Sequence, residues 1–156
     1  MVLLHPYVPG HRPADQCPTW EALADLLDME GGQQWHVPCR NPQDYAMALR
    51  VAGGSGADVL VVEHDIVPTR ELVTELVACE HPFCATDYVV EAGRLWSSLP
   101  EGLGLGLALV RTAAWEAITQ WPRVPQVAWT DVAGVMRDRL PPVHVHPGPA
   151  QHSHHY

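Results

Sequence analysis

The feature that most constrains the fold is the aliphatic run Val59–Val62, which follows the helix-breaking sequence Gly53–Gly56 and leads directly into Glu63, His64 and Asp65. Consecutive aliphatic residues, mostly β-branched, are typical of a strand that is covered on both faces. Strands of that kind occur in parallel sheets with helices on either side. The run therefore predicts a buried strand of an α/β domain, with acidic side chains at its carboxyl end.

The segments before this run alternate between strand and helix patterns. Residues 2–8 and 34–39 form short, largely apolar runs, and helical spacing of apolar residues follows them over residues 19–27 and 43–52. This β-α-β-α-β order predicts right-handed crossovers and a mostly parallel central sheet with helices on both faces. In such sheets ligands bind beyond the carboxyl ends of the strands. The triplet Glu63-His64-Asp65 is predicted to lie there.

The rest of the chain continues the same pattern, with a strand over residues 83–90 and helices that begin at Thr69, Arg111 and Trp129. A last strand carries His144 and His146 on one face. We therefore expect one α/β domain over residues 1–150 and a His-rich tail over residues 151–156.

Charge and hydropathy exclude two classes of function. The formal net charge is -9 and the chain contains no lysine. This argues against sequence-independent binding to a nucleic-acid polymer, which requires a basic surface. No apolar run reaches the roughly 18 residues of a membrane span. The N-terminus lacks the basic leader of a signal peptide, so we expect a cytoplasmic protein.

The four cysteines, Cys17, Cys39, Cys79 and Cys84, are scattered along the chain. The spacing of Cys79 and Cys84 differs from the two-residue gap of a zinc knuckle. Free cysteines are among the most frequently buried residues. We therefore expect reduced and partly buried thiols.

The carboxylates of the triplet predict a metal site. On an extended segment Glu63 and Asp65 point to the same side and His64 points away, so the two acids can share one divalent cation. Oxygen ligands favour Mg²⁺ or Mn²⁺, and an added imidazole favours Mn²⁺. The alternative is that the acids cap the following helix or pair with an arginine.

Several motifs occur in a characteristic order. The aliphatic strand ends in Glu63-His64-Asp65, followed by Ile66-Val67-Pro68 and a helix. Residues 102–118, GLGLGLALVRTAAWEAI, combine a glycine-containing strand, an arginine and a helix. Trp129-Thr130-Asp131 and the terminal HVHPG of residues 144–148 follow. In this order the motifs resemble those of the GT-A class of nucleotide-sugar-dependent glycosyltransferases, whose D-x-D motif, catalytic base and C-terminal histidine they match in place.

The resemblance covers most of residues 1–152 and implies a single-domain, Rossmann-like GT-A sandwich. It implies transfer of a sugar from a nucleoside diphosphate sugar to an acceptor hydroxyl, with inversion and with Mn²⁺ or Mg²⁺ as cofactor. Two departures are that the triplet begins with Glu where Asp is usual, and that the chain is shorter than typical members.

The resemblance also implies roles for individual residues. Glu63 and Asp65 would hold the metal together with His146 or, as second choice, His152, and Asp131 would be the catalytic base. The donor would contact Pro6, Tyr7, Arg12, Asp44 and His64.

Several alternatives remain open. Asp131 also suits a helix N-terminus, where the helix dipole favours an acid, and His64 also suits a surface imidazole. At the level of function, the alternatives are a nucleotidyltransferase of related α/β fold and a non-catalytic metal- or nucleotide-binding module.

Overall fold

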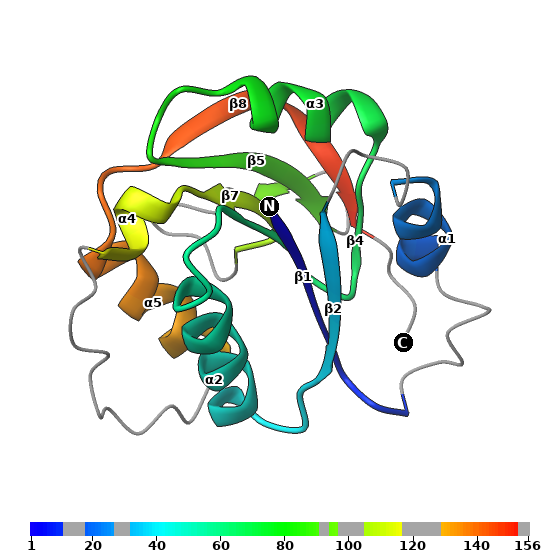
Figure 1. The fold of residues 1–156 in the computed structure, drawn as a ribbon. Coiled ribbons are helices and arrows are strands. Elements are labelled where there is room, and N and C mark those ends of the chain that lie inside the picture. The colour runs from blue at the N-terminus through cyan, green and yellow to red at the C-terminus, as the bar shows by residue number, and fades with distance from the viewer. Residues whose placement is uncertain (11–17, 27–31, 91–93, 97–104, 117–128, 153–156) are drawn as a thin grey trace.

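The elements of the computed structural model follow the patterns of the sequence closely (Figure 1). The structure describes residues 1–10, 18–26, 32–90, 94–96, 105–116 and 129–152. The strands are β1 (Val2–Tyr7), β2 (Gln33–Pro38), β3 (Val59–Val62), β4 (Ile66–Val67), β5 (Phe83–Val90), β6 (Arg94–Trp96), β7 (Leu107–Val110) and β8 (His144–His152). The helices are α1 (Pro18–Asp25), α2 (Pro42–Gly53), α3 (Arg70–Ala78), α4 (Thr112–Glu116) and α5 (Trp129–Arg139).

All described strands belong to one sheet, in the order β2-β1-β3-β7-β5-β8-β4, with β6 paired to β5. Strands β1, β2 and β3 pair in parallel, as do β5 and β8. Strand β7 lies between β3 and β5 and is antiparallel to both, so β1, β2, β3, β5 and β8 share one direction. The sheet is therefore mixed but mostly parallel.

The two faces of the sheet are covered by different helices, because side chains alternate along each strand. In β3, Val59 and Val61 pack with residues of α2, α4 and α5. Leu60 and Val62 face the other way and pack with residues of α1 and α3. All four side chains of β3 are fully buried, and Figure 1 shows α2 and α5 on one side of the sheet and α3 on the other. The predicted α/β domain with helices on both faces is confirmed.

Local signals set the helix boundaries. Asn41 caps α2 by accepting a hydrogen bond from the backbone N–H of Asp44, and Pro42 follows at the first turn. Thr69 caps α3 in the same way through the N–H of Leu72. Both caps remove unsatisfied donors at helix starts that the sequence predicts to within a few residues.

Helix α2 ends at a glycine because Trp115 of α4 lies directly against it. A Cβ atom added at Gly53 would stand 2.4 Å from a carbon of the Trp115 ring. Any larger residue would displace this buried indole, which belongs to the core beneath α2. The glycine-rich break after α2 therefore has a packing cause as well as a turn-forming one.

The structure differs from expectation in two places. The short strand β4 was not predicted, and its pairing with β8 extends the sheet through Gln151 and His152, beyond the expected domain end at residue 150. Cys79 and Cys84 form a disulfide instead of two thiols. Cys39 is the free, buried cysteine of the described residues.

None of the described helices is both long enough and apolar enough to cross a membrane.

Candidate functional site

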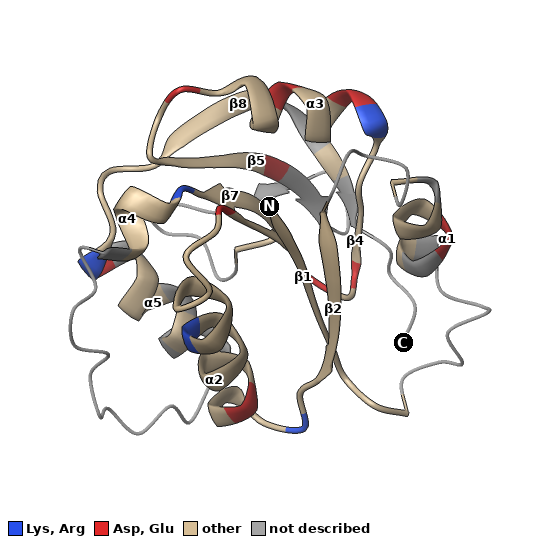
Figure 2. Ribbon diagram, viewed as in Figure 1, with Lys and Arg blue, Asp and Glu red and all other residues tan. Residues whose placement is uncertain are grey.

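The acidic triplet forms a tight turn at the carboxyl end of β3. The N–H of Ile66 donates a hydrogen bond to the carbonyl oxygen of Glu63 at 3.0 Å, and the chain reverses into β4. Figure 2 shows the acidic positions where β3 passes into β4. Because His64 and Asp65 lie in this turn, the segment is not extended. The geometric reason for expecting Glu63 and Asp65 on one face does not apply.

The carboxylate of Glu63 fastens β3 to its neighbours. Its Oε1 accepts hydrogen bonds from the hydroxyl of Tyr45 at 2.7 Å and from the N–H of Leu105 at 3.2 Å. Its Oε2 accepts from the N–H of Gly106 at 3.0 Å, and the carbonyl of Gly106 accepts from the N–H of Glu63. Gly106 has a φ of 57°, which favours glycine at this point. Both carboxylate oxygens are thus engaged in holding α2, β3 and the start of β7 together.

Burial dominates the electrostatics of this group. It raises the pKa of Glu63, the nearby charge of Asp65 raises it further, and the hydrogen bonds from Tyr45, Gly106 and Leu105 lower it in part. Burial, followed by the charge of Glu63 and the hydrogen bond to it, raises the pKa of Tyr45 well above its ordinary value. Tyr45 is therefore a neutral donor, and Glu63 is a structural anchor of the site.

A histidine cluster that the sequence analysis missed lies beside Asp65. His5 of β1 is fully buried, and its Nδ1 lies 3.0 Å from the carbonyl oxygen of Val62. The rings of His5 and His36, from paired strands, meet edge to face with centroids 5.6 Å apart. Burial lowers the pKa of His5 to about 4, with further lowering by His36 and His64 and some raising by Asp65. His5 is therefore neutral at pH 7. The sequence feature that could have indicated this cluster is the histidine within the largely apolar run VLLHPY of β1.

The two histidines expected to complete the metal site lie in different places. His152 pairs with Ile66, so its backbone is adjacent to the turn that holds Asp65. His146 pairs instead with Thr86 of β5. Thr86 lies about four residues, or about 13 Å, before the carboxyl end of that strand. Its ring lies with Cys79 and Cys84. The structure thus brings the backbone of His152 to the acidic turn but does not bring His146 there.

The expected donor-binding residues are only partly assembled. Pro6 and Tyr7 end β1 at the same edge of the sheet as the turn, and Tyr7 is partly exposed. His64 lies in the turn, where its carbonyl oxygen accepts a hydrogen bond from the hydroxyl of Thr19 at 2.9 Å. Asp44 lies at the start of α2, and its carboxylate accepts from the N–H of Arg40 at 2.8 Å.

For two expected site residues the structure does not describe the side chain. Arg12 lies outside the described residues. Asp131 is in the first turn of α5, and its side chain is not among those described.

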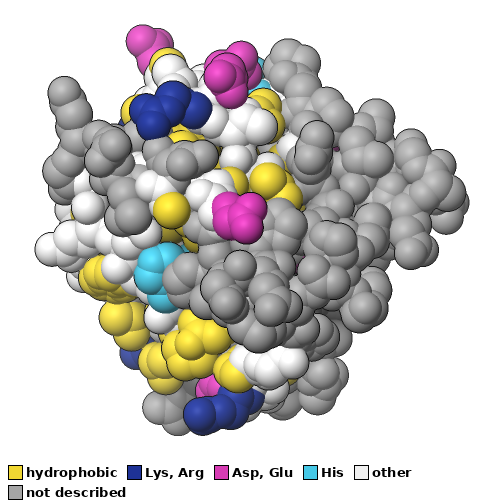
Figure 3. Space-filling model, turned by 90° about the vertical axis from the view of Figure 1, so that its right-hand side faces the viewer, with side chains coloured by type: hydrophobic (Ala, Val, Ile, Leu, Met, Phe, Trp, Pro, Cys, Tyr) yellow, Lys and Arg dark blue, Asp and Glu magenta, His cyan; other side chains and the backbone are white. Residues whose placement is uncertain are grey.

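The described surface carries no continuous basic stripe on the face shown in Figure 3, where basic side chains stand near the upper and lower margins and acidic ones also appear between them. This distribution agrees with the net charge of -9. An anionic ligand would therefore depend on local neutralisation at its site.

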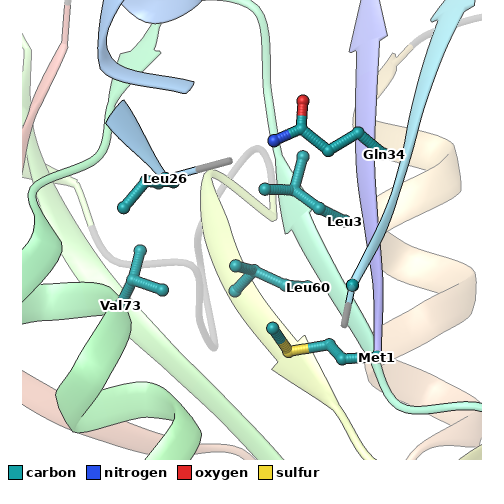
Figure 4. A pocket seen from close by; sticks show the side chains of 7 residues that line it. Met1, Leu3, Leu26, Gln34, Leu60 and Val73 are labelled. Atoms are coloured by element: carbon teal, nitrogen blue, oxygen red, sulfur yellow. The ribbon is translucent and has the colours of Figure 1, made fainter. Parts of the chain in front are cut away.

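A small pocket lies away from the acidic turn, between α1, α3 and the amino-terminal half of β1 and β3 (Figure 4). Its side-chain lining is apolar except for an amide, and it consists of Met1, Leu3, Leu26, Gly32, Gln34, Leu60 and Val73. The amide nitrogen of Gln34 lies 3.4 Å from the carbonyl oxygen of Leu23 in α1. The pocket contains no titratable side chain, and we regard it as a packing gap under the helices.

Comparison with known proteins indicates the fold of the chain but does not identify a family. No protein-family model matches the chain, and no curated sequence matches it significantly. Among solved structures, the crystal structure of A197 from STIV superposes with a TM-score of 0.59 at 13% identity, over 93% of this chain and 81% of that chain. A 4-diphosphocytidyl-2C-methyl-D-erythritol synthase from Anaerococcus prevotii DSM 20548 gives a TM-score of 0.48 at 10% identity, over 99% and 90% of the two chains. The superposition on A197 supports the fold, a single small α/β domain.

Proposed function

We propose that this protein is a divalent-metal-dependent transferase that moves a sugar from a nucleoside diphosphate sugar to an acceptor hydroxyl. The observation that carries the proposal is the acidic turn at the carboxyl end of β3, in a mostly parallel sheet, with Glu63 held rigidly behind Asp65. Ligand sites of open α/β sheets occur at this edge. The order of the sequence motifs supports the same assignment.

The residues at this edge suit Mn²⁺ or Mg²⁺. Asp65 offers a carboxylate, and His152 is the histidine whose backbone is adjacent to it. Such oxygen and nitrogen donors are typical of Mn²⁺ sites. Glu63 has both oxygens engaged, so in this proposal it orients the turn and Asp65 is the direct ligand. The cation, when bound, would neutralise the charge of the diphosphate leaving group.

The chain's own residues would supply binding and proton transfer. Tyr7 and Pro6 at the end of β1 would contact the nucleoside, Arg12 the phosphates, and Asp44 the base. In this scheme Asp131 takes the proton of the acceptor hydroxyl, which gives inversion at the sugar carbon.

Nucleotidyl transfer is the second candidate. It would use the same edge of the sheet, and the segment after β1 would contact a triphosphate. Gly10 in that segment has a φ of 92°, which favours glycine, and Arg12 follows it in the sequence. A triphosphate carries more negative charge than a diphosphate sugar. On an acidic chain without lysine, this favours the sugar donor.

The identity of the released product separates the candidates. The protein is incubated with Mn²⁺ and either a panel of nucleoside diphosphate sugars or nucleoside triphosphates with sugar phosphates. Release of nucleoside diphosphate supports glycosyl transfer or the slow donor hydrolysis that accompanies it, and release of pyrophosphate supports nucleotidyl transfer. Asp65→Asn is the inactive comparison, and Glu71→Gln, an exposed acid of α3, is the matched control. Nucleotide binding without any product would contradict both reactions and favour a binding module.

A further inference from the structure

A second group of metal-binding side chains lies at the other end of the sheet from the acidic turn. Cys79 caps the carboxyl end of α3, and Cys84 is the second residue of β5. His146 is in the neighbouring strand β8. The two sulfur atoms and a ring nitrogen of His146 all lie within 4.8 Å of one another. Three separate elements thus direct soft or borderline ligands to one point.

The surroundings of these atoms indicate a constructed site. The exposed fractions of Cys79 and Cys84 are 7% and 0%. The Nε2 atom of His146 is buried and has no hydrogen-bond partner among the described residues. A buried imidazole nitrogen without a partner is costly, because it has lost hydration without gaining a hydrogen bond. A cation held by a ring nitrogen of His146 and the two sulfurs would give this imidazole a partner.

Two further histidines border the group and offer a fourth ligand. His81 lies between the cysteines in the sequence and stacks on His144 with ring centroids 4.2 Å apart. His144 in turn meets His146 edge to face, with centroids 4.9 Å apart. Both His81 and His144 are exposed, so either ring can turn toward an ion held by the three inner ligands.

We propose that Cys79, Cys84 and His146, completed by His81 or His144, form a zinc site that alternates with the Cys79–Cys84 disulfide. Two thiolates and one or two imidazoles are a common tetrahedral donor set for Zn²⁺. At Zn–S distances of about 2.3 Å, two thiolates on one ion stand about 3.8 Å apart. The Cα atoms of the two cysteines are 6.8 Å apart, so both side chains reach a shared ion.

The exchange between the two forms is a redox reaction with a defined balance. A two-electron reductant, such as a dithiol or a phosphine, cleaves the S–S bond, and two protons give two thiols. Zinc then displaces those two protons and bonds to both thiolates. Oxidation by a disulfide or a peroxide reverses the sequence, reforms the S–S bond and releases the ion.

This site is independent of the proposed transferase chemistry. None of the residues assigned to donor, acceptor or catalytic metal belongs to it once His152 replaces His146 beside Asp65. The bound metal would link the end of α3 to β5, as the disulfide does in the oxidised form, and would add a link to β8 through His146.

Cobalt replaces zinc in the test, because thiolate-bound Co²⁺ gives a charge-transfer absorption that imidazoles alone do not give. The whole chain is reduced with a phosphine under nitrogen and titrated with Co²⁺, then with Zn²⁺ as competitor. We expect one equivalent of Co²⁺ with thiolate charge-transfer bands and the intense d–d bands of a tetrahedral site, both lost on zinc addition. The oxidised chain should show no thiolate band.

Variants locate the ligands. Cys84→Ser and His146→Gln should each weaken cobalt binding on the order of 100-fold. Cys39→Ala, which removes the free cysteine of the described residues, should leave cobalt binding unchanged. His146→Gln also keeps the disulfide, so its fold can be checked in the oxidised form. Cobalt binding without a thiolate band would overturn the proposal and point to histidines elsewhere in the chain. Equal loss in Cys39→Ala would overturn it and point to Cys39 as a ligand.

Discussion

The two ends of the sheet differ in how their polar side chains are hydrogen bonded. At the end that holds the turn after β3, the carboxylate of Glu63 accepts three hydrogen bonds and anchors the neighbouring residues. At the other end, the buried Nε2 of His146 lacks a partner among the described residues, and a ring nitrogen of His146 lies within 4.8 Å of two sulfur atoms. A satisfied polar group rigidifies its surroundings, whereas an unsatisfied one indicates a missing partner. The first end thus fixes the turn that holds Asp65, whereas the second brings together the ligands of the proposed zinc site.

The largest expected effect tests whether Asp65 is functional and Glu63 structural. Asp65→Asn should reduce turnover on the order of 10²- to 10³-fold, because a neutral amide is a poorer ligand for the cation. Its free energy of unfolding should change little. The assay is product release with Mn²⁺, accompanied by urea unfolding. Activity equal to the wild type would remove Asp65 from the site and end the contrast between the two acids.

The complementary change at Glu63 should act on stability. Glu63→Ala leaves the Tyr45 hydroxyl and the N–H groups of Leu105 and Gly106 without their acceptor, which should lower the free energy of unfolding by about 3 kcal/mol. Glu71→Ala on the exposed face of α3 is the control and should change it by less than about 0.5 kcal/mol. Urea unfolding followed by circular dichroism measures both. A small effect at Glu63 would mean that these hydrogen bonds contribute little.

Acid should lower the free energy of unfolding through His5, which lies at the end of the sheet that holds the turn. The pKa of His5 is lowered to about 4, so between about pH 6.5 and pH 4 the unfolded chain binds a proton that the folded chain does not. Stability is therefore complete above the unfolded pKa and falls as the pH decreases. Between about pH 7.5 and pH 5 the loss from this group is about 2 kcal/mol.

His5→Asn keeps a donor for the carbonyl of Val62 and removes the titration, so its stability should depend less on pH over this range. The measurement is the urea midpoint as a function of pH. His36→Asn is the comparison, because burial also lowers the pKa of His36 but its ring is less buried. Parallel pH profiles for His5→Asn and the wild type would contradict the assignment.

The smallest expected effect concerns α3, the helix that connects the two ends. Thr69→Ala removes the N-cap that accepts from the N–H of Leu72, and should lower the free energy of unfolding by about 1 kcal/mol. Thr69→Ser should restore most of it. Because the cap touches neither group of ligands, cobalt binding and turnover should stay unchanged, and a loss of either would show that the two ends are coupled through this helix.

The sequence predicts those parts of the fold that depend on neighbouring residues. The strand at Val59–Val62, the cap at Thr69 and the α/β class all follow from local patterns and match the structure. The reversed direction of β7 and the pairing of β4 with β8 could not be predicted, because they depend on contacts between residues far apart in the chain.

The same limit applies to the sites. The sequence places Glu63 and Asp65 at the end of a strand, but the turn that separates their roles is set by hydrogen bonds from Tyr45 and Gly106. The sequence favours His146 over His152 as a ligand, and only the register of β8 shows that His152 is the one adjacent to Ile66. Likewise, the spacing of Cys79 and Cys84 does not suggest a metal site until His146 is brought beside them.

The position of β8 has a consequence for the order of folding. This strand lies between β5 and β4, and among the described residues it is the strand that pairs with β4. During synthesis the β1, β2 and β3 layer can form as soon as residues 1–62 have emerged, whereas β4 must wait for residues 151 and 152 to pair with it. Chains interrupted before residue 144 therefore expose an open edge at β5, and such edges recruit strands from other molecules. Incomplete chains of this protein should aggregate through that edge.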